Sequence, residues 1–267
     1  MSRVIPLKPA RAAQPAAAGA ASAATSGAPA FTVPPPLSLY IHFPWCVRKC
    51  PYCDFNSHTV RDGIPEAAYI DALIADLESS LPDIWGRRVQ TIFFGGGTPS
   101  LMTPEALDRL LTAVRTRVNL SPEAEITLEA NPGTVEADRF KGFRDAGVNR
   151  LSIGVQSFDD RQLAALGRIH DTREARRAID LALRTFERVN IDLMYALPQQ
   201  TLAEALSDLD TAIATGVSHL SCYHLTLEPN TPFAAQPPEL PDDDVSADMQ
   251  EAIESRLADA GFVHYET

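Results

Sequence analysis

Three of the four cysteines of this chain lie within eight residues, at Cys46, Cys50 and Cys53. The gaps of three residues and then two allow one loop to present three thiolates to an iron–sulfur cluster, which uses such soft ligands. A complete set for a [4Fe–4S] cluster would be four cysteines, but Cys222 is far away in sequence. The pattern therefore predicts a [4Fe–4S] cluster with one iron open to an exchangeable ligand.

Two other uses of clustered cysteines match the pattern less well. A zinc site usually closes with a fourth Cys or His in paired spacing, and the sequence has no second pair. Three cysteines cannot all pair with one another as disulfides. A metal-type cysteine loop instead indicates a reducing compartment, and we expect a cytoplasmic protein.

A glycine-rich turn, Gly95-Gly96-Gly97-Thr98, directly follows a short apolar run. Without Cβ atoms, the backbone of such a turn can approach a ligand closely. The turn lacks the Gly-Lys-Ser/Thr ending of a phosphate loop, and a tight turn without a ligand is the simpler alternative. Beside an open cluster we favour backbone recognition of an amino-acid moiety.

Two acidic residues occupy apolar strands, Glu129 at the end of one and Asp192 within another. Burying a carboxylate costs free energy unless it is paired. We therefore expect each to meet a cation or a hydroxyl-bearing ligand, with an internal ion pair as the alternative. Gln156 and Arg168 carry little weight when each is taken alone.

The elements that must position these residues alternate between apolar strands and amphipathic helices. Strands are expected at 37–43, 91–94, 126–130, 149–154, 190–195 and 217–226, and a seventh is expected to begin at 262–265. Helices are expected at 65–81, from Pro104 after an N-cap at Thr103, at 136–147, after caps at Thr172 and Thr201, and up to Gly261. Repeated strand–helix units predict an α/β fold, a partial (β/α)6 TIM-like barrel of parallel strands. Its chemistry gathers at the carboxyl ends of the strands.

The composition limits both the partners and the extent of the fold. The net charge of −12 argues against a nucleic-acid-binding surface, and no stretch approaches the roughly 20 apolar residues of a membrane span. Residues 1–36 are rich in Ala and Pro and contain no acidic residue. Three basic residues give this region some likeness to a transit peptide, but a disordered extension before a domain at 37–267 fits better.

Together these motifs resemble the radical S-adenosylmethionine (SAM) superfamily, and within it the oxygen-independent coproporphyrinogen III oxidase-like family. The resemblance covers residues 37–267. The stretches that carry it are 40–46, 53–56, 95–98, 151–158, 166–168 and 191–195.

The resemblance implies a role for each candidate residue. Cys46, Cys50 and Cys53 would hold the cluster, and the amino and carboxylate groups of SAM would chelate the open iron. The implied SAM contacts are Tyr40, Tyr52, Gly96, Gly97, Thr98, Glu129, Gln156, Arg168 and Asp192. The two tyrosines would line the SAM site, and the glycine turn would meet the methionine end. The implied electron donor is a protein such as flavodoxin or ferredoxin.

Phe55 bears on the branch of this family. True oxidases carry a further cysteine at this position, whereas 53–58 is similar to the haem chaperone branch, whose members bind haem as cargo and pass it to an acceptor protein. The alternatives are the oxidase, which decarboxylates coproporphyrinogen III without oxygen, and another radical SAM enzyme acting on RNA or a small metabolite. Relatives continue beyond Thr267, so we expect the C-terminal family domain to be missing.

Overall fold

The computed structural model describes residues 33–84, 86–134 and 137–266. The chain divides into two units, Met1–Pro35 and Pro36–Thr267, and the fold below is that of the second. Most of the extension expected at 1–36 lies outside the described residues.

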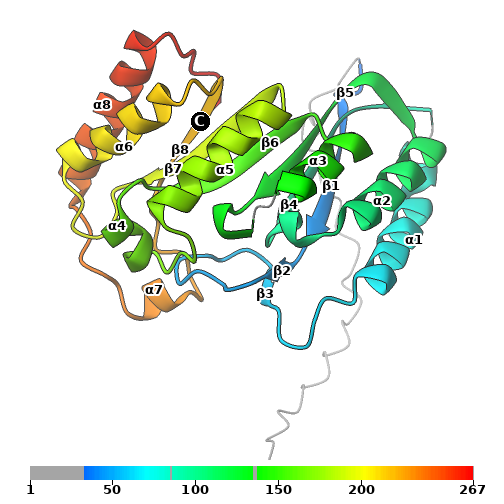
Figure 1. Ribbon diagram of the computed structural model, residues 1–267, viewed down its shortest axis with the longest axis horizontal. Coiled ribbons are helices and arrows are strands. Elements are labelled where there is room, and N and C mark those ends of the chain that lie inside the picture. Colours follow the sequence, from blue (N-terminus) through cyan, green and yellow to red (C-terminus); the bar gives the residue numbers. More distant parts are fainter. Residues whose placement is uncertain (1–32, 85, 135–136, 267) are drawn as a thin grey trace, which may run out of the picture. The chain divides into compact units, whose positions relative to one another are not determined.

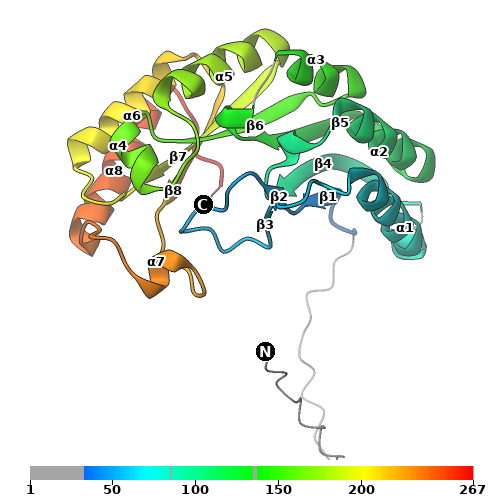
Figure 2. The ribbon, with the colours of Figure 1, turned by 60° about the horizontal axis from the view of Figure 1, so that its bottom comes forward.

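A six-stranded parallel sheet forms the centre of this unit. Its strands are β1 (Leu37–Phe43), β4 (Arg88–Gly96), β5 (Asn119–Ala130), β6 (Arg150–Gln156), β7 (Arg188–Tyr195) and β8 (His219–His224). They pair in the order β1-β4-β5-β6-β7-β8, and every pair is parallel. Strands β1 and β8 are the two edge strands and do not pair with each other, so the curved sheet forms an open barrel (Figure 2). The predicted partial α/β barrel is confirmed.

Helices cover the convex side of the curved sheet (Figure 2). They are α1 (Glu66–Ile84), α2 (Pro104–Arg117), α3 (Ala137–Ala146), α5 (Thr172–Thr185), α6 (Leu202–Ala214) and α8 (Asp243–Asp259), whereas the short helices α4 (Asp160–Ala165) and α7 (Pro232–Ala235) lie at one edge of the sheet. The 3-10 turns η1 (Pro99–Leu101) and η2 (Pro132–Thr134) follow β4 and β5, and a short ribbon pairs β2 (Trp45–Cys46) with β3 (His58–Thr59). None of the described helices is long and apolar enough to cross a membrane.

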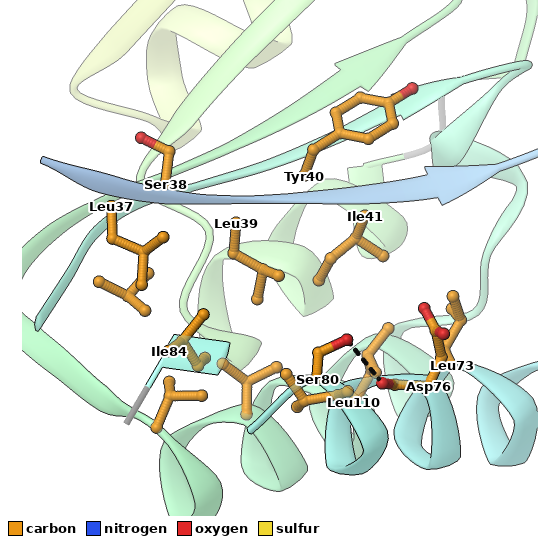
Figure 3. Close-up of a pocket in the computed structure, with 14 residues that line it drawn as sticks. Leu37, Ser38, Leu39, Tyr40, Ile41, Leu73, Asp76, Ser80, Ile84 and Leu110 are labelled. Atoms are coloured by element: carbon orange, nitrogen blue, oxygen red, sulfur yellow. Dashed lines mark hydrogen bonds between the residues drawn. The ribbon is translucent and has the colours of Figure 1, made fainter. Parts of the chain in front are cut away.

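Strand alternation separates an apolar face from a polar one. On β1, Leu39 and Ile41 point toward α1 and α2, whereas Ser38 and Tyr40 point the opposite way (Figure 3). An apolar cavity of about 140 Å³ lies between this strand and the two helices. The largest fully buried side chains, including Phe43, belong to the same helix-side core. The core thus occupies the convex side, which leaves the concave face for polar residues.

The structure confirms two of the predicted helix caps and contradicts a third. Thr103 accepts a hydrogen bond from the Ala106 N–H, and Thr201 forms a capping box with Glu204. The cap predicted at Thr172 is wrong, because Asp171 fills that role and Thr172 is the first residue of α5. A carboxylate one residue earlier reaches the same free N–H groups of the first turn.

The strand predicted at 262–265 is also wrong, since the described residues there form no strand. The Phe262 N–H bonds to the Leu257 carbonyl and completes the end of α8. Strand β5 begins at Asn119, earlier than predicted, and extends the sheet at its amino end.

Candidate functional site

The cysteine loop leaves β1 at the carboxyl edge of the sheet and is closed at its base. The Pro44 carbonyl accepts a hydrogen bond from the His58 N–H at 2.7 Å, and the Cys46 carbonyl accepts one from the Val60 N–H at 2.9 Å. All three cysteines of the loop are free thiols, with Cys46 buried and Cys50 and Cys53 partly buried. One loop thus carries all three predicted ligands.

The glycine turn after β4 seats this loop. The Gly97 N–H donates to the Phe43 carbonyl at 2.7 Å, and the Thr98 N–H donates to the Trp45 carbonyl at 2.8 Å. A Cβ on Gly97 would lie 2.7 Å from the Trp45 oxygen, so a side chain there would push the loop away. These two N–H groups hold the loop, and the predicted contact of Gly96, Gly97 and Thr98 with SAM stays a prediction.

Arg168, which follows α4, reaches the far end of the loop. Its guanidinium donates to the Gly154 carbonyl at 2.7 Å and lies 3.5 Å from the Cys50 Sγ and 3.4 Å from the Tyr52 hydroxyl. The Arg168 Nε is buried without a hydrogen-bond partner in the structure. Arg168 thus places a positive charge beside the Cys50 sulfur.

Two further contacts fasten the loop across the opening of the barrel. A Cβ on Gly167, whose φ is +69°, would lie 2.9 Å from the Pro51 Cδ, so only glycine allows this approach. The Phe233 N–H at α7 donates a hydrogen bond to the Pro51 carbonyl at 3.1 Å. The centroid of the Phe233 ring lies 6.3 Å from that of the Tyr52 ring. Figure 1 shows the β2–β3 ribbon, α4 and α7 at the same edge of the sheet.

Glu129 and Asp192 are partly buried carboxylates on the concave face. Burial raises the pKa of Glu129 to about 7, and the nearby Asp192 charge adds to this, whereas the Gly96 N–H hydrogen bond opposes it. Burial likewise raises the pKa of Asp192 to about 6, against hydrogen bonds from neighbouring side chains. Arg150, the cation that acts on Asp192, is itself 3.3 Å from Glu125. The two acids together suit a cationic ligand.

Tyr40 completes this side of the site. Its hydroxyl lies 3.0 Å from the His42 Nδ1, and its ring stacks on Phe93 with centroids 6.3 Å apart. A Cβ on Gly95 would lie 3.0 Å from the Tyr40 ring and 3.3 Å from the Glu129 Oε2, so both side chains meet over this glycine. Tyr40 is 57% exposed, which leaves its ring open to a ligand.

Gln156 ends β6 in a left-handed conformation, with φ of +71°, beside a register shift against β7. A Cβ on Gly154 would lie 3.0 Å from the Gln156 Nε2 and 3.5 Å from an Arg168 nitrogen. Gly154 is the register partner of Asp192. Gln156 and Arg168 therefore lie beside the acidic side of the site.

The residues present fit a cluster, although their roles remain predictions. The described residues contain no group of three or more His, Cys, Asp or Glu drawn together as around a single ion. A cluster binds each cysteine to a different iron, so the three sulfurs need not converge on one point. The free thiols of one loop and the partly unpartnered Arg168 beside Cys50 have the chemistry that such a group requires.

Sequence reasoning missed three residues, Asn190, Ser152 and Ser221, whose side chains surround Asp192. Asn190 precedes Asp192 by two positions on one strand, and this spacing is the signal that could have placed both on one face. The two serines lie on other strands, so no local pattern marks them.

Comparison with known proteins identifies the superfamily to which this fold and its cysteine loop belong. The family model of the radical SAM superfamily matches residues 40–212, and the chain belongs to that superfamily. The chain is 55% identical over 237 residues to the heme chaperone HemW of Escherichia coli, which covers 87% of this chain and 62% of the relative. It is 40% identical to the mitochondrial radical S-adenosyl methionine domain-containing protein 1 of Bos taurus, over 86% of this chain and 53% of that protein. The chain thus spans about three fifths or less of the length of these relatives.

A solved structure agrees with the fold. Coproporphyrinogen III oxidase (HemN) of Escherichia coli, a radical SAM enzyme, aligns with a TM-score of 0.77 and 30% sequence identity. The alignment covers 85% of this chain and 54% of that structure.

Proposed function

We propose that this chain forms the radical SAM core of a haem chaperone, which binds haem as cargo and transfers it to an acceptor protein. The observation that carries the proposal is the 55% identity to the HemW of Escherichia coli, together with a loop of three free cysteines and two partly buried acids on the same domain. Phe55, where the oxidase branch has a further cysteine, supports the same branch and is 58% exposed.

Within the proposal, Cys46, Cys50 and Cys53 hold a [4Fe–4S] cluster. When bound, this group would supply one electron to the sulfonium of SAM, received from a donor such as flavodoxin or ferredoxin. Arg168 balances the negative charge at Cys50, which it contacts at 3.5 Å. Glu129 and Asp192 accept hydrogen bonds from the amino or ribose groups of SAM.

The remaining residues orient the same ligand. Tyr40 and Tyr52 line the SAM site from β1 and the cysteine loop, and Gln156 holds a polar group of SAM at the end of β6. Burial raises the pKa of the Tyr52 hydroxyl, so this group stays neutral and can donate a hydrogen bond. We place the protein in the cytoplasm, in keeping with its free cysteines.

The oxidase is the second candidate, because the coproporphyrinogen III oxidase of Escherichia coli shares the fold at 30% identity. A haem titration combined with a product assay separates the two. The anaerobically reconstituted protein should bind haem and form no protoporphyrinogen IX from coproporphyrinogen III. Efficient decarboxylation of that substrate would refute the chaperone and establish the oxidase.

Replacing Cys46 with alanine gives a further prediction. The variant should lose the cluster yet keep part of its haem binding, because haem ligation needs its own axial group and pocket. Transfer of haem to an apo-acceptor should fail, and this can be followed by the haem absorption of the separated acceptor. Transfer at the wild-type rate from the cluster-free variant would mean that the cluster plays no part in it.

A further inference from the structure

A hydrogen-bond network on the concave face surrounds the Asp192 carboxylate. The Asn190 Nδ2 donates to the Asp192 Oδ1 at 2.7 Å, and the Ser152 Oγ lies 3.1 Å from both carboxylate oxygens. Asn190 also joins the two serines, with its Nδ2 2.9 Å from the Ser152 Oγ and 3.0 Å from the Ser221 Oγ. One amide thus connects every member of the network.

The register of three adjacent strands brings these side chains together. Ser152 on β6 is the partner of Asn190 on β7, and Ser221 on β8 is the partner of Asp192. Asn190 and Asp192 are two residues apart and therefore share a face. The donors thus come from both sides of the carboxylate and from its own strand.

Burial makes this network costly unless it is satisfied. Asn190 is only 3% exposed and Ser152 only 7%, so their polar atoms must find partners within the protein. The network fixes the plane of the carboxylate, which keeps a defined side of Asp192 for a ligand.

We infer that Asn190, Ser152 and Ser221 are positioning residues that hold the Asp192 carboxylate, ionised and oriented, toward a cationic or hydroxyl-bearing ligand on the concave face. This inference rests on the proposed function, which makes SAM that ligand. Each of the three acts through Asp192.

The charges around Asp192 support this role. Burial favours the protonated acid, and hydrogen bonds from the three side chains lower its pKa, as does the positive charge of Arg150 on β6. The other titratable groups that interact with Asp192 electrostatically are Glu129 on β5 and Cys222 and Tyr223 on β8. Without the donors, Asp192 would remain protonated closer to neutral pH and would lose part of its acceptor strength.

The test measures SAM affinity of the cluster-loaded protein at pH 6.5 and pH 8.5. Asn190→Ala, and separately the double variant Ser152→Ala/Ser221→Ala, should weaken binding about tenfold at pH 6.5, as expected for a weakened charged hydrogen bond. The loss should be smaller at pH 8.5, where the carboxylate is ionised again. Asn149→Ala is the matched control, because that amide makes two hydrogen bonds, at 2.8 and 2.9 Å, to backbone groups only. It should leave the affinity unchanged.

A carboxyl-carbon NMR titration of Asp192 in the absence of SAM, with the signal assigned through Asp192→Asn, separates the inference from the proposed function. Both network variants should raise the Asp192 pKa above its wild-type value of about 6. An unchanged titration in folded variants would overturn the inference, even if wild-type protein bound SAM. A raised pKa with unchanged SAM affinity at both pH values would overturn the assignment of the network to the SAM site. Failure of wild-type protein to bind SAM would instead refute the proposed function.

Discussion

Replacing Cys50 with alanine should abolish the broad visible absorption of the reconstituted protein and most of its bound iron. Cys50 is the middle ligand of the loop and the one that Arg168 contacts at 3.5 Å. Without it, two thiolates remain on a loop that must hold roughly four irons. Iron and sulfide analysis after anaerobic reconstitution measures the effect.

Cys222→Ala is the matched control for that experiment. Cys222 packs against the helix-side core, and burial raises its thiol pKa to about 11, so it is a poor thiolate ligand. The control variant should keep its full iron content. Full iron content in the Cys50→Ala variant would refute a cluster held by the three cysteines.

Removing the carboxylate of either Glu129 or Asp192 should weaken SAM binding about tenfold or more. A hydrogen bond to a charged group contributes ~1.5–3 kcal/mol, and about 1.4 kcal/mol corresponds to a factor of ten in affinity. The Glu129→Ala and Asp192→Ala variants, with their clusters intact, test this by equilibrium dialysis of SAM. Unchanged affinity in both would assign these acids to structural roles.

The same carboxylates predict how pH acts on binding and on folding. A ligand cation requires ionised Glu129, so SAM affinity should rise as the pH increases through about 7, the Glu129 pKa. Stability should change in the opposite direction, because the unfolded chain releases this proton near its ordinary pKa and the folded chain holds it up to about 7. Glu129→Gln should therefore bind SAM more weakly but unfold at higher denaturant concentration than wild type at pH 8. Reduced stability of that variant at pH 8 would show that the burial cost is offset by contacts within the protein.

Much of the fold followed from local patterns in the sequence. Strands such as β6 and β7 carry buried apolar residues, and helices with clear caps such as Thr103 begin between the strands. The predictions at Thr172 and at 262–265 failed because they depended on local cues alone. Asp171, and not Thr172, is the N-cap of α5. Beyond α8, the Phe262 N–H bonds to the Leu257 carbonyl at the helix end, and the described residues there do not pair with a strand.

The assembly of the site was less accessible to sequence reasoning. Arg168 meets Cys50 across 118 positions of sequence, and α7 is a four-residue helix without a detectable period. The contact of Gly97 with the cysteine loop could not be predicted from the sequence either. The sequence reveals that a Cβ is missing there, but only the structure shows that the Trp45 carbonyl of the cysteine loop occupies that space.

By our proposal, three cysteines hold a cluster whose remaining iron takes SAM. Electron paramagnetic resonance of the reduced cluster, recorded with and without SAM, tests it most directly. SAM should change the spectrum of the wild-type protein and should change it less, at equal SAM concentration, in the Asp192→Ala variant. A reduced cluster whose spectrum is the same with saturating SAM as without it would contradict the open iron and the site built around it.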